Sequence, residues 1–142
     1  MKKLLTILTS LLLSTSVLAD ELRCGYLHIA MINNTGHNCI LTGKKVINSY
    51  RVDGAIPEFI PNNTLTPSFR IQQTYTSGPQ ISLEYQCENK TIKITSQQDY
   101  CFMAAGQITG KTQLSNNAHA DYATMTGSYW GDIHGQIIWK FY

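Results

Sequence analysis

The clearest alternation of apolar and polar residues lies in the middle of the chain. Residues 81–87 read ISLEYQC and residues 91–95 read TIKIT, so every second side chain is apolar in both. A period of two is typical of a strand with one buried face and one wet face. We expect a hairpin with a two-residue loop at residues 89–90, which places Cys87 opposite Ile92. A slip by one residue would turn the apolar side chains after the loop toward water, so the register should be firm.

Similar short segments follow one another along the rest of the chain. Residues 54–67 contain three prolines and are predicted to form a loop. No segment after residue 19 shows a helical period. The further predicted strands are residues 22–32, 39–41, 46–52, 68–75, 101–112, 119–126 and 136–142. About eight short strands bounded by turn residues predict an all-β fold, either a small antiparallel β-sandwich or a partly open barrel.

The first nineteen residues have the pattern of a secretory signal. Lys2 and Lys3 form a short basic start of bacterial type, residues 4–13 are mostly apolar, and residues 17–19 end in a small residue. The apolar run is too short to span a bilayer, so we expect no transmembrane segment in the mature chain. The sequence therefore predicts export to the periplasm or the medium, with one domain at residues 20–142.

The charge balance changes once the predicted signal is removed. The chain has eleven basic and nine acidic residues, and Lys2 and Lys3 account for the excess. The mature part is expected to have a formal net charge of zero, without a run of Lys or Arg. Nucleic acid is therefore not expected as a partner.

The four cysteines predict two disulfide bonds, because an exported chain meets an oxidising compartment. No two cysteines have C-x2-C spacing, which disfavours zinc. The strand after the central turn leads away from Cys87, and the residues that follow it could bring the chain back. We therefore predict a bond between Cys87 and Cys101, which leaves Cys24 to pair with Cys39.

No catalytic constellation is visible in the sequence, and we expect neither enzyme activity nor a cofactor. Residues 127–131 resemble G-x-S-x-G only with the Ser one place early, and the cysteines are expected to be paired. The carboxylates are scattered, so an enzyme with an unmarked carboxylate pair stays an alternative. His119 with Asp121, and Asp132 with His134, are two possible pairs of metal ligands. Neither pair has a third and fourth ligand in view, so no metal site is predicted.

The candidate binding residues lie in an aromatic loop. Tyr129 and Trp130 stand between Gly127 and Gly131, in a segment predicted to be a long turn. Exposed aromatic side chains mark contacts with sugars, proteins or membranes. The other interpretation is that Trp130 folds back over the open end of the sandwich. We predict that Tyr129 and Trp130 form a contact surface, with Lys140 nearby as a charged partner.

Two short motifs of the chain match those of a known family. Residues 83–87, LEYQC, precede an acidic residue, and Thr126-Gly127 is followed by Lys140 after Trp139. These residues resemble the periplasmic C-type lysozyme inhibitors. That family has a Ser-Gly pair and a Lys in a W-x-K context, so Thr replaces Ser here and the spacer is missing. In that family the loop residues enter the lysozyme cleft and engage its catalytic carboxylates. The resemblance implies that Thr126 and Lys140 would bind lysozyme.

The layout of the chain is also similar to that of the aegerolysin-type lipid-binding sandwiches. Both are small all-β proteins, and this chain has an I-N-N-T-G turn at residues 32–36 and a Trp-bearing loop. This likeness implies a membrane lipid as partner. The function expected from the sequence is a non-enzymatic binding module that contacts a protein, glycan or lipid surface. A lysozyme inhibitor and an aegerolysin-like lipid binder are the alternatives.

Overall fold

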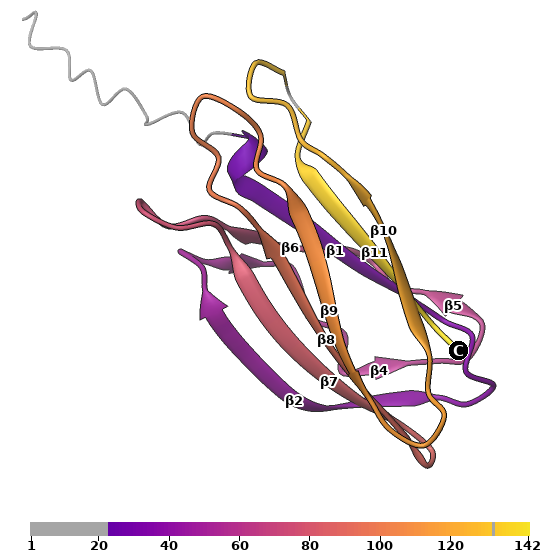
Figure 1. Cartoon of the computed structure of the whole chain (residues 1–142). Helices are drawn as coiled ribbons and strands as arrows, with labels where there is room; N and C mark the ends of the chain where they lie inside the picture. Colours follow the sequence, from indigo (N-terminus) through magenta and orange to yellow (C-terminus); the bar gives the residue numbers. More distant parts are fainter. Residues whose placement is uncertain (1–22, 132) are drawn as a thin grey trace, which may run out of the picture.

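Two β-sheets make up the protein, as the sequence pattern predicted (Figure 1). The structure, a computed structural model, describes residues 23–131 and 133–142, so the predicted signal and Asp132 lie outside the described residues. One sheet has the strand order β10-β11-β1-β6-β3, with β5 also paired to β1, and the other has the order β4-β2-β7-β8-β9. A 3-10 turn, η1 (Arg23–Gly25), leads into the first strand. The strands are β1 (Tyr26–Asn33), β2 (Cys39–Asn48), β3 (Val52–Asp53), β4 (Phe59–Ile60), β5 (Thr64–Leu65), β6 (Phe69–Gln72), β7 (Gln80–Cys87), β8 (Lys90–Gln98), β9 (Ile108–Leu114), β10 (Ala120–Met125) and β11 (Gly135–Phe141).

The first and last strands lie side by side within the first sheet. β1 and β11 run parallel, with Ile29 opposite Ile137. The other pairs between described strands are antiparallel. Because β10 also pairs with β11, the C-terminal strand has a neighbour on each side.

The core lies between the sheets and is built from the predicted apolar faces. Trp139 of β11 is fully buried, and its indole Nε1–H donates to Ser96 Oγ of β8 at 2.9 Å. This bond joins the two sheets and satisfies a buried polar group. Tyr85 of β7 is also buried and donates its hydroxyl to the Pro57 carbonyl at 2.9 Å. Burial raises the pKa of the Tyr85 hydroxyl well above its ordinary value, so the group stays protonated as a donor.

The central hairpin forms, but its turn lies one residue earlier than predicted. Tyr85 is opposite Ile92 and Cys87 is opposite Lys90, so the two loop residues are Glu88 and Asn89. Moving the loop by one residue shifts the pairing by two, which keeps every side chain on its predicted face. Glu88 has a positive φ of 57°, which lies in the left-handed region that such a turn requires.

Several strand boundaries differ from the prediction. Residues 39–48 form one strand and not the two predicted. Shifts in the pairing register with β7, at Leu41/Gly43 and Val46/Asn48, let the strand continue through Gly43. Residues 54–67 contain the short strands β4 and β5. The three prolines lie outside both strands, so the residues of β4 and β5 keep the N–H groups that strand pairing needs. Residues 101–107 form a loop, and the predicted strand begins only at Ile108.

The predicted disulfide connectivity is wrong. The bonds join Cys24 to Cys101 and Cys39 to Cys87, with Cα–Cα distances of 5.8 and 4.1 Å. Cys39 lies directly opposite Cys87 in the pairing of β2 with β7. The strand β8 separates Cys87 from Cys101 by about 30 Å of extended chain, so these two cysteines lie toward opposite ends of the sandwich.

Candidate functional site

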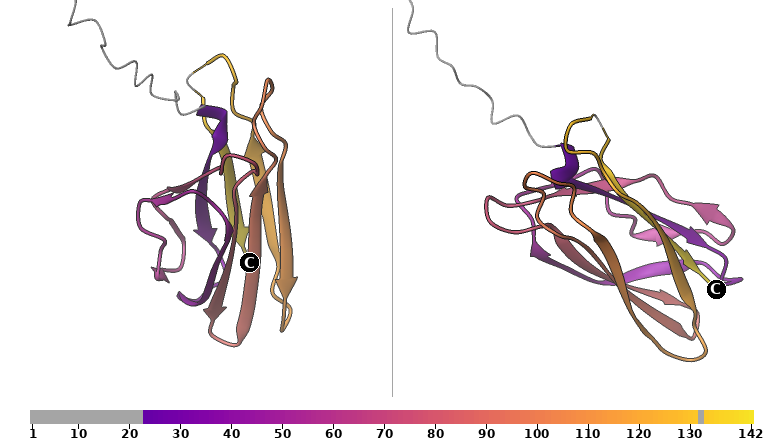
Figure 2. Two further views of the ribbon diagram at one scale, coloured as in Figure 1. Left: turned by 90° about the vertical axis from the view of Figure 1, so that its left-hand side faces the viewer. Right: turned by 45° about the horizontal axis from the view of Figure 1, so that its top comes forward.

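Four loops lie toward the same end of the strands: those after β8 and β10 are at the top of Figure 1, and those after β2 and β6 are at its left-hand side. The register brings them together: Gln80 of β7 is opposite both Asn48 of β2 and Gln97 of β8. On the other sheet, Tyr26 is opposite Gln72, and Leu27 is opposite Gly135. The loops are residues 49–51 after β2, 73–79 after β6, 99–107 after β8 and 126–134 after β10. Two further views show the loops after β8 and β10 projecting beyond the ends of the strands (Figure 2).

These loops expose large apolar side chains, a group that we call the aromatic end. Trp130 is 91% exposed and Tyr75 is 83% exposed, which is unusual for such large rings. The aromatic end consists of Tyr50, Tyr75, Tyr100, Phe102, Met103, Trp130 and Ile133. Several large apolar side chains exposed toward one end of a protein are typical of a site of interaction.

The aromatic side chains contact one another from loop to loop. Tyr50 lies edge-on to Tyr75, with ring centroids 6.0 Å apart, which links the β2–β3 loop to the β6–β7 loop. Tyr100 donates its hydroxyl to the Tyr75 carbonyl at 3.0 Å and stacks on Phe102 at 6.4 Å. Three of the four loops are therefore connected through Tyr75 and Tyr100.

The base of the β8–β9 loop is held by the Cys24–Cys101 disulfide and by Gln73. The backbone N–H of Cys101 donates to Gln73 Oε1 at 2.8 Å, and Gln73 Nε2 donates to the Cys101 carbonyl at 3.2 Å. Gln73 also donates its backbone N–H to the Gly25 carbonyl at 2.8 Å. The loop that carries Phe102 is thus fixed to η1 and to the β6–β7 loop.

The β10–β11 loop is closed by its own backbone and rests on a pair of histidines. Ser128 donates its N–H to the Ile133 carbonyl at 2.9 Å, which narrows the loop below Trp130. His134 stacks on His28 of β1, and His28 Nε2 lies 2.6 Å from His134 Nδ1. Burial, and then the positive charge of Arg70, lower the pKa of His28 below its ordinary value. The histidine pair is therefore favoured with His28 neutral.

The structure answers the question that the sequence left open about Trp130. Its side chain projects into solvent and does not cover the core, and Tyr129 packs edge-on against it at 4.7 Å. Thr126 is exposed at the start of the same loop. At least one of the flanking glycines is required by close packing. A Cβ at Gly127 would lie 2.8 Å from the Ile133 carbonyl oxygen, so close packing requires this glycine.

The prediction that Lys140 lies beside the aromatic loop is wrong. β11 begins at Gly135 next to the loop, and Lys140 is five residues further along, at about 17 Å of extended strand. Lys140 is opposite Asp121 and Ile32, and its ammonium group lies 5.1 Å from the ring centroid of Tyr142. The loop and this lysine are separated because one strand carries them at its two ends.

The residues considered for metal binding do not gather into a site within the described part of the chain. No group of three or more His, Cys, Asp or Glu residues is placed to hold an ion there. His119 and Asp121 lie 3.2 Å apart as an exposed pair. In the same part of the chain, no helix has the length and apolar character needed to cross a membrane.

Sequence reasoning missed six members of the aromatic end, one of which, Ile133, lies in the same loop as Trp130. Tyr75, Phe102 and Met103 fell within segments predicted to be strands, where aromatic and apolar residues are expected. Tyr50 was placed in a predicted strand for the same reason, and Tyr100 was taken as part of a return segment. Their position next to turn residues, such as the Ser77-Gly78-Pro79 run after Tyr75, was the signal available.

Fold and site together define a disulfide-bonded β-sandwich with one aromatic loop end. No family model matches the sequence, and no curated protein matches it. The structure is similar to that of the lipid binding protein Nakanori, with a TM-score of 0.65, 11% identity and coverage of 82% of this chain and 70% of that chain. It is also similar to IP-1A from Alcaligenes faecalis, with a TM-score of 0.56, 9% identity and coverage of 85% and 92%. At such low identity these likenesses show a shared fold.

Proposed function

We propose that this protein is a non-enzymatic binding module that docks on a lipid membrane through its aromatic end. The observation that carries the proposal is the gathering of exposed apolar side chains on four neighbouring loops. Tyr and Trp favour the membrane interface because their rings are apolar while the hydroxyl or N–H can meet the headgroups. Tyr100 and Trp130 both have this character.

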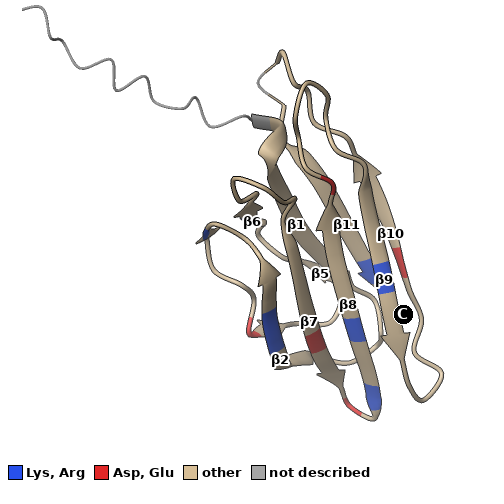
Figure 3. Cartoon of the chain, turned by 60° about the vertical axis from the view of Figure 1, so that its left-hand side comes forward, with Lys and Arg blue, Asp and Glu red and all other residues tan. Residues whose placement is uncertain are grey.

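Charge is sparse at this end, which favours contact with an apolar layer. Residues 73–79 contain no charged residue, and the sequence of each of the other three loops has one: Arg51, Asp99 and Asp132. The upper loops are accordingly drawn almost without charged positions (Figure 3). Burying a charge in an apolar environment is costly, so few charges means a small desolvation penalty on docking.

The contacts within the aromatic end also favour binding, because they order the loops before a partner arrives. The Cys24–Cys101 disulfide, the Gln73 bonds and the Tyr100–Tyr75 bond restrain the loops in the unbound protein. Less conformational entropy is then lost on binding, which raises affinity.

The comparison with Nakanori supports a lipid as the partner in preference to a protein or glycan, since that protein is described as lipid binding and has the same fold. The lysozyme inhibitor resemblance is not favoured, because Thr126 follows β10 near the start of β11, whereas Lys140 lies near the end of β11. As part of the proposal, we infer that the chain is exported, since its two disulfides are typical of proteins in oxidising compartments.

Vesicle binding tests the proposal directly, and the two tryptophans provide a built-in reporter. Trp139 is buried and should keep its fluorescence, whereas Trp130 is exposed and should shift to shorter wavelength on entering a membrane. We expect the protein to float with phosphatidylcholine vesicles and to show this shift. A protein that stays unbound, with an unchanged spectrum, at high lipid concentration would exclude the proposal for this lipid class.

Two exposed phenylalanines make a matched pair for locating the contact surface. Phe102 is 66% exposed at the aromatic end, and Phe59 is 53% exposed on β4, next to the far end of β2. We expect Phe102→Ala to weaken vesicle binding by about tenfold or more, because a buried aromatic ring contributes on the order of 1.5–3 kcal/mol. Phe59→Ala should bind as the unchanged protein does. Equal losses in the two variants would mean that the aromatic end is not the docking surface.

A further inference from the structure

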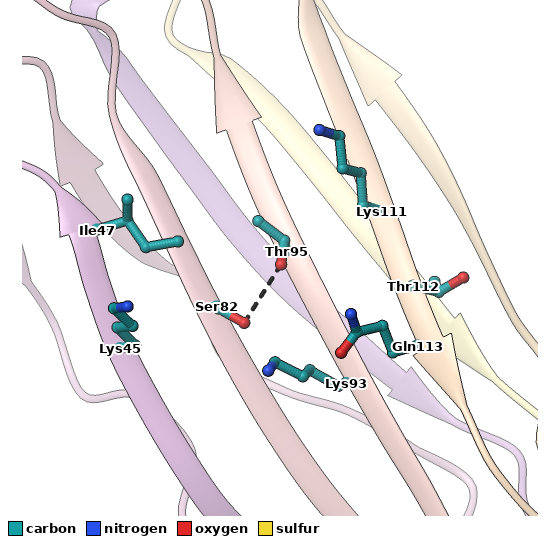
Figure 4. A pocket seen from close by; sticks show the side chains of 8 residues that line it. All are labelled: Lys45, Ile47, Ser82, Lys93, Thr95, Lys111, Thr112 and Gln113. Carbon is teal, nitrogen blue, oxygen red and sulfur yellow. Dashed lines mark hydrogen bonds between the residues drawn. The ribbon is translucent and has the colours of Figure 1, made fainter.

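A second surface lies on the outer face of the five-stranded sheet, away from the aromatic side chains. It is a shallow depression of about 350 Å³ around Ser82 and Thr95 (Figure 4). Three lysines from three different strands line it: Lys45 of β2, Lys93 of β8 and Lys111 of β9. Figure 4 shows their side chains surrounding the two hydroxyl residues.

Strand register explains why these residues meet. Lys45 is opposite Ser82, Ser82 is opposite Thr95, and Thr95 is opposite Lys111, so the four form one row across the sheet. The Cα atoms at the two ends of this row are about 14 Å apart at the usual strand spacing. Lys93 lies on the same face of β8, two residues before Thr95, and β8 runs between the strands of the two end lysines. Three long side chains can therefore reach a single anion above Ser82.

The positive charge of this group is only partly balanced. Among the described residues, none of the three lysines takes part in an ion pair. The neighbouring acid is Glu84, opposite Lys93, and its carboxylate accepts a hydrogen bond from Thr42 at 3.2 Å. Lys93 and Lys111 are diagonal neighbours on β8 and β9, and like charges at short range repel, so the excess of positive charge here favours a bound anion.

The floor of the depression supplies hydroxyl donors as well as charge. Thr95 Oγ1 donates to Ser82 Oγ at 3.2 Å, so the Ser82 hydroxyl proton can still be donated to a ligand. Ser82 is largely buried, and the three lysines lie on different sides of the Ser82–Thr95 pair (Figure 4). On a flat surface, the lysines would point into solvent independently of one another. Here the depression gives them a shared position next to two hydroxyl groups.

We propose that this lysine row binds a multivalent anion of the phosphate class. Lysine ammonium groups bind phosphate as point charges, and hydroxyls add directed hydrogen bonds. The row lies two residues from the strand ends at Gln80 and Gln97, which is about 7 Å from the loops of the aromatic end. The anion can therefore be a soluble phosphate or the headgroup of an anionic lipid. The site does not depend on membrane docking, because it lies on a different set of residues.

Titration with pyrophosphate tests the site, using two double variants that remove the same charge. Lys93→Gln with Lys111→Gln removes two lysines of the row, and Lys90→Gln with Lys140→Gln removes two lysines elsewhere. Because each lysine near an anionic group contributes on the order of a fivefold factor, the loss of two should weaken binding about 25-fold in the first variant. The control variant should bind within about twofold of the unchanged protein, since distant charges are screened.

Vesicles identify the source of the anion and separate this site from the aromatic end. If the ligand is a headgroup, phosphatidic acid in phosphatidylcholine vesicles should strengthen binding, and the row variant should lose that gain. Phe102→Ala should instead weaken binding to pure phosphatidylcholine and leave pyrophosphate binding unchanged. A response in the pyrophosphate titration alone indicates a soluble phosphate. Equal behaviour of the two double variants toward both pyrophosphate and phosphatidic acid, or no binding of either, overturns the proposal.

Discussion

The Tyr100 hydroxyl donates a 3.0 Å hydrogen bond to the carbonyl of Tyr75, although the two residues belong to different loops. Tyr75 and Tyr100 expose their rings at the same end of the sandwich. A bond between loop tips orders surface that would otherwise fluctuate, and it does so without covering the apolar rings. The aromatic end is therefore exposed and restrained at the same time.

The exposed Trp130 and the buried Trp139 should respond differently to replacement by alanine. Trp130→Ala should change the free energy of unfolding by no more than about half a kcal/mol, as for other surface substitutions. It should nevertheless weaken membrane binding by about 2 kcal/mol or more, as expected of an interface hot spot. Trp139→Ala should cost about 3–5 kcal/mol of stability, because it empties the core and leaves Ser96 without its donor.

Urea unfolding of both tryptophan variants, with vesicle flotation of Trp130→Ala, checks this contrast. Trp130→Phe serves as the control, since it keeps an aromatic ring while removing the fluorescent reporter. A Trp130→Ala protein as unstable as the Trp139→Ala protein would contradict the exposed position of the loop.

Removing the two disulfides should have different consequences for function. Each bond closes a long loop and should contribute roughly 4 kcal/mol in the chain-entropy model. Cys24→Ser with Cys101→Ser should also weaken vesicle binding, because it releases the loop that carries Phe102. Cys39→Ser with Cys87→Ser should lower stability alone, since that bond lies within one sheet away from the aromatic end.

Peptide mapping under non-reducing conditions comes first in this test, and it should recover Cys24 linked to Cys101 and Cys39 linked to Cys87. Flotation is then measured below the melting temperature of each variant. Equal binding by the two folded variants would show that the disulfide at the aromatic end does not order the docking surface.

The histidine pair predicts how stability depends on pH. The folded state lowers the pKa of His28 below its ordinary value of 6.5. The unfolded chain therefore binds more protons in the range just below pH 6.5, so stability present above 6.5 is lost as the pH falls through the folded pKa. We expect the urea midpoint to drop between pH 7 and pH 5, and the drop to be smaller in His28→Gln.

His119→Gln is the matched control for that measurement, because His119 is exposed and its imidazole contacts only surface groups, Asp121 and Tyr142, among the described residues. It should retain the pH dependence of the unchanged protein. If His28→Gln and the unchanged protein lose stability in parallel, the histidine pair is not the source of the effect.

Close packing at one glycine gives a further prediction. A Cβ at Gly78 would lie 1.9 Å from the Gln98 carbonyl oxygen, so Gly78→Ala must displace backbone at the base of the aromatic end. Such overpacking typically costs about 1–3 kcal/mol. Gly36 has a positive φ of 86° but open space around it, so Gly36→Ala should cost only about 1–2 kcal/mol from its backbone conformation. Thermal unfolding compares the two, and a milder effect at Gly78 would argue against the close approach.

Local pattern alone was enough to predict the all-β fold and the buried faces of its long strands. The alternation at residues 81–87 and at Ile137, Trp139 and Phe141 identifies the core, because successive side chains of a strand point to opposite faces. The Trp130 loop could also be found, since flanking glycines interrupt the strand pattern around it. These features depend on neighbours in the sequence.

Only the tertiary structure decided the disulfide pairing, the grouping of the aromatic loops and the lysine row. Cys39 meets Cys87 because β2 pairs with β7, and Lys45 and Lys111 lie in one row because β2, β7, β8 and β9 pair in register. Lys140 is separated from Trp130 because a strand of fixed rise lies between them. Such contacts depend on which strands become neighbours, and that choice is made by packing two sheets around one core, which a local pattern does not encode.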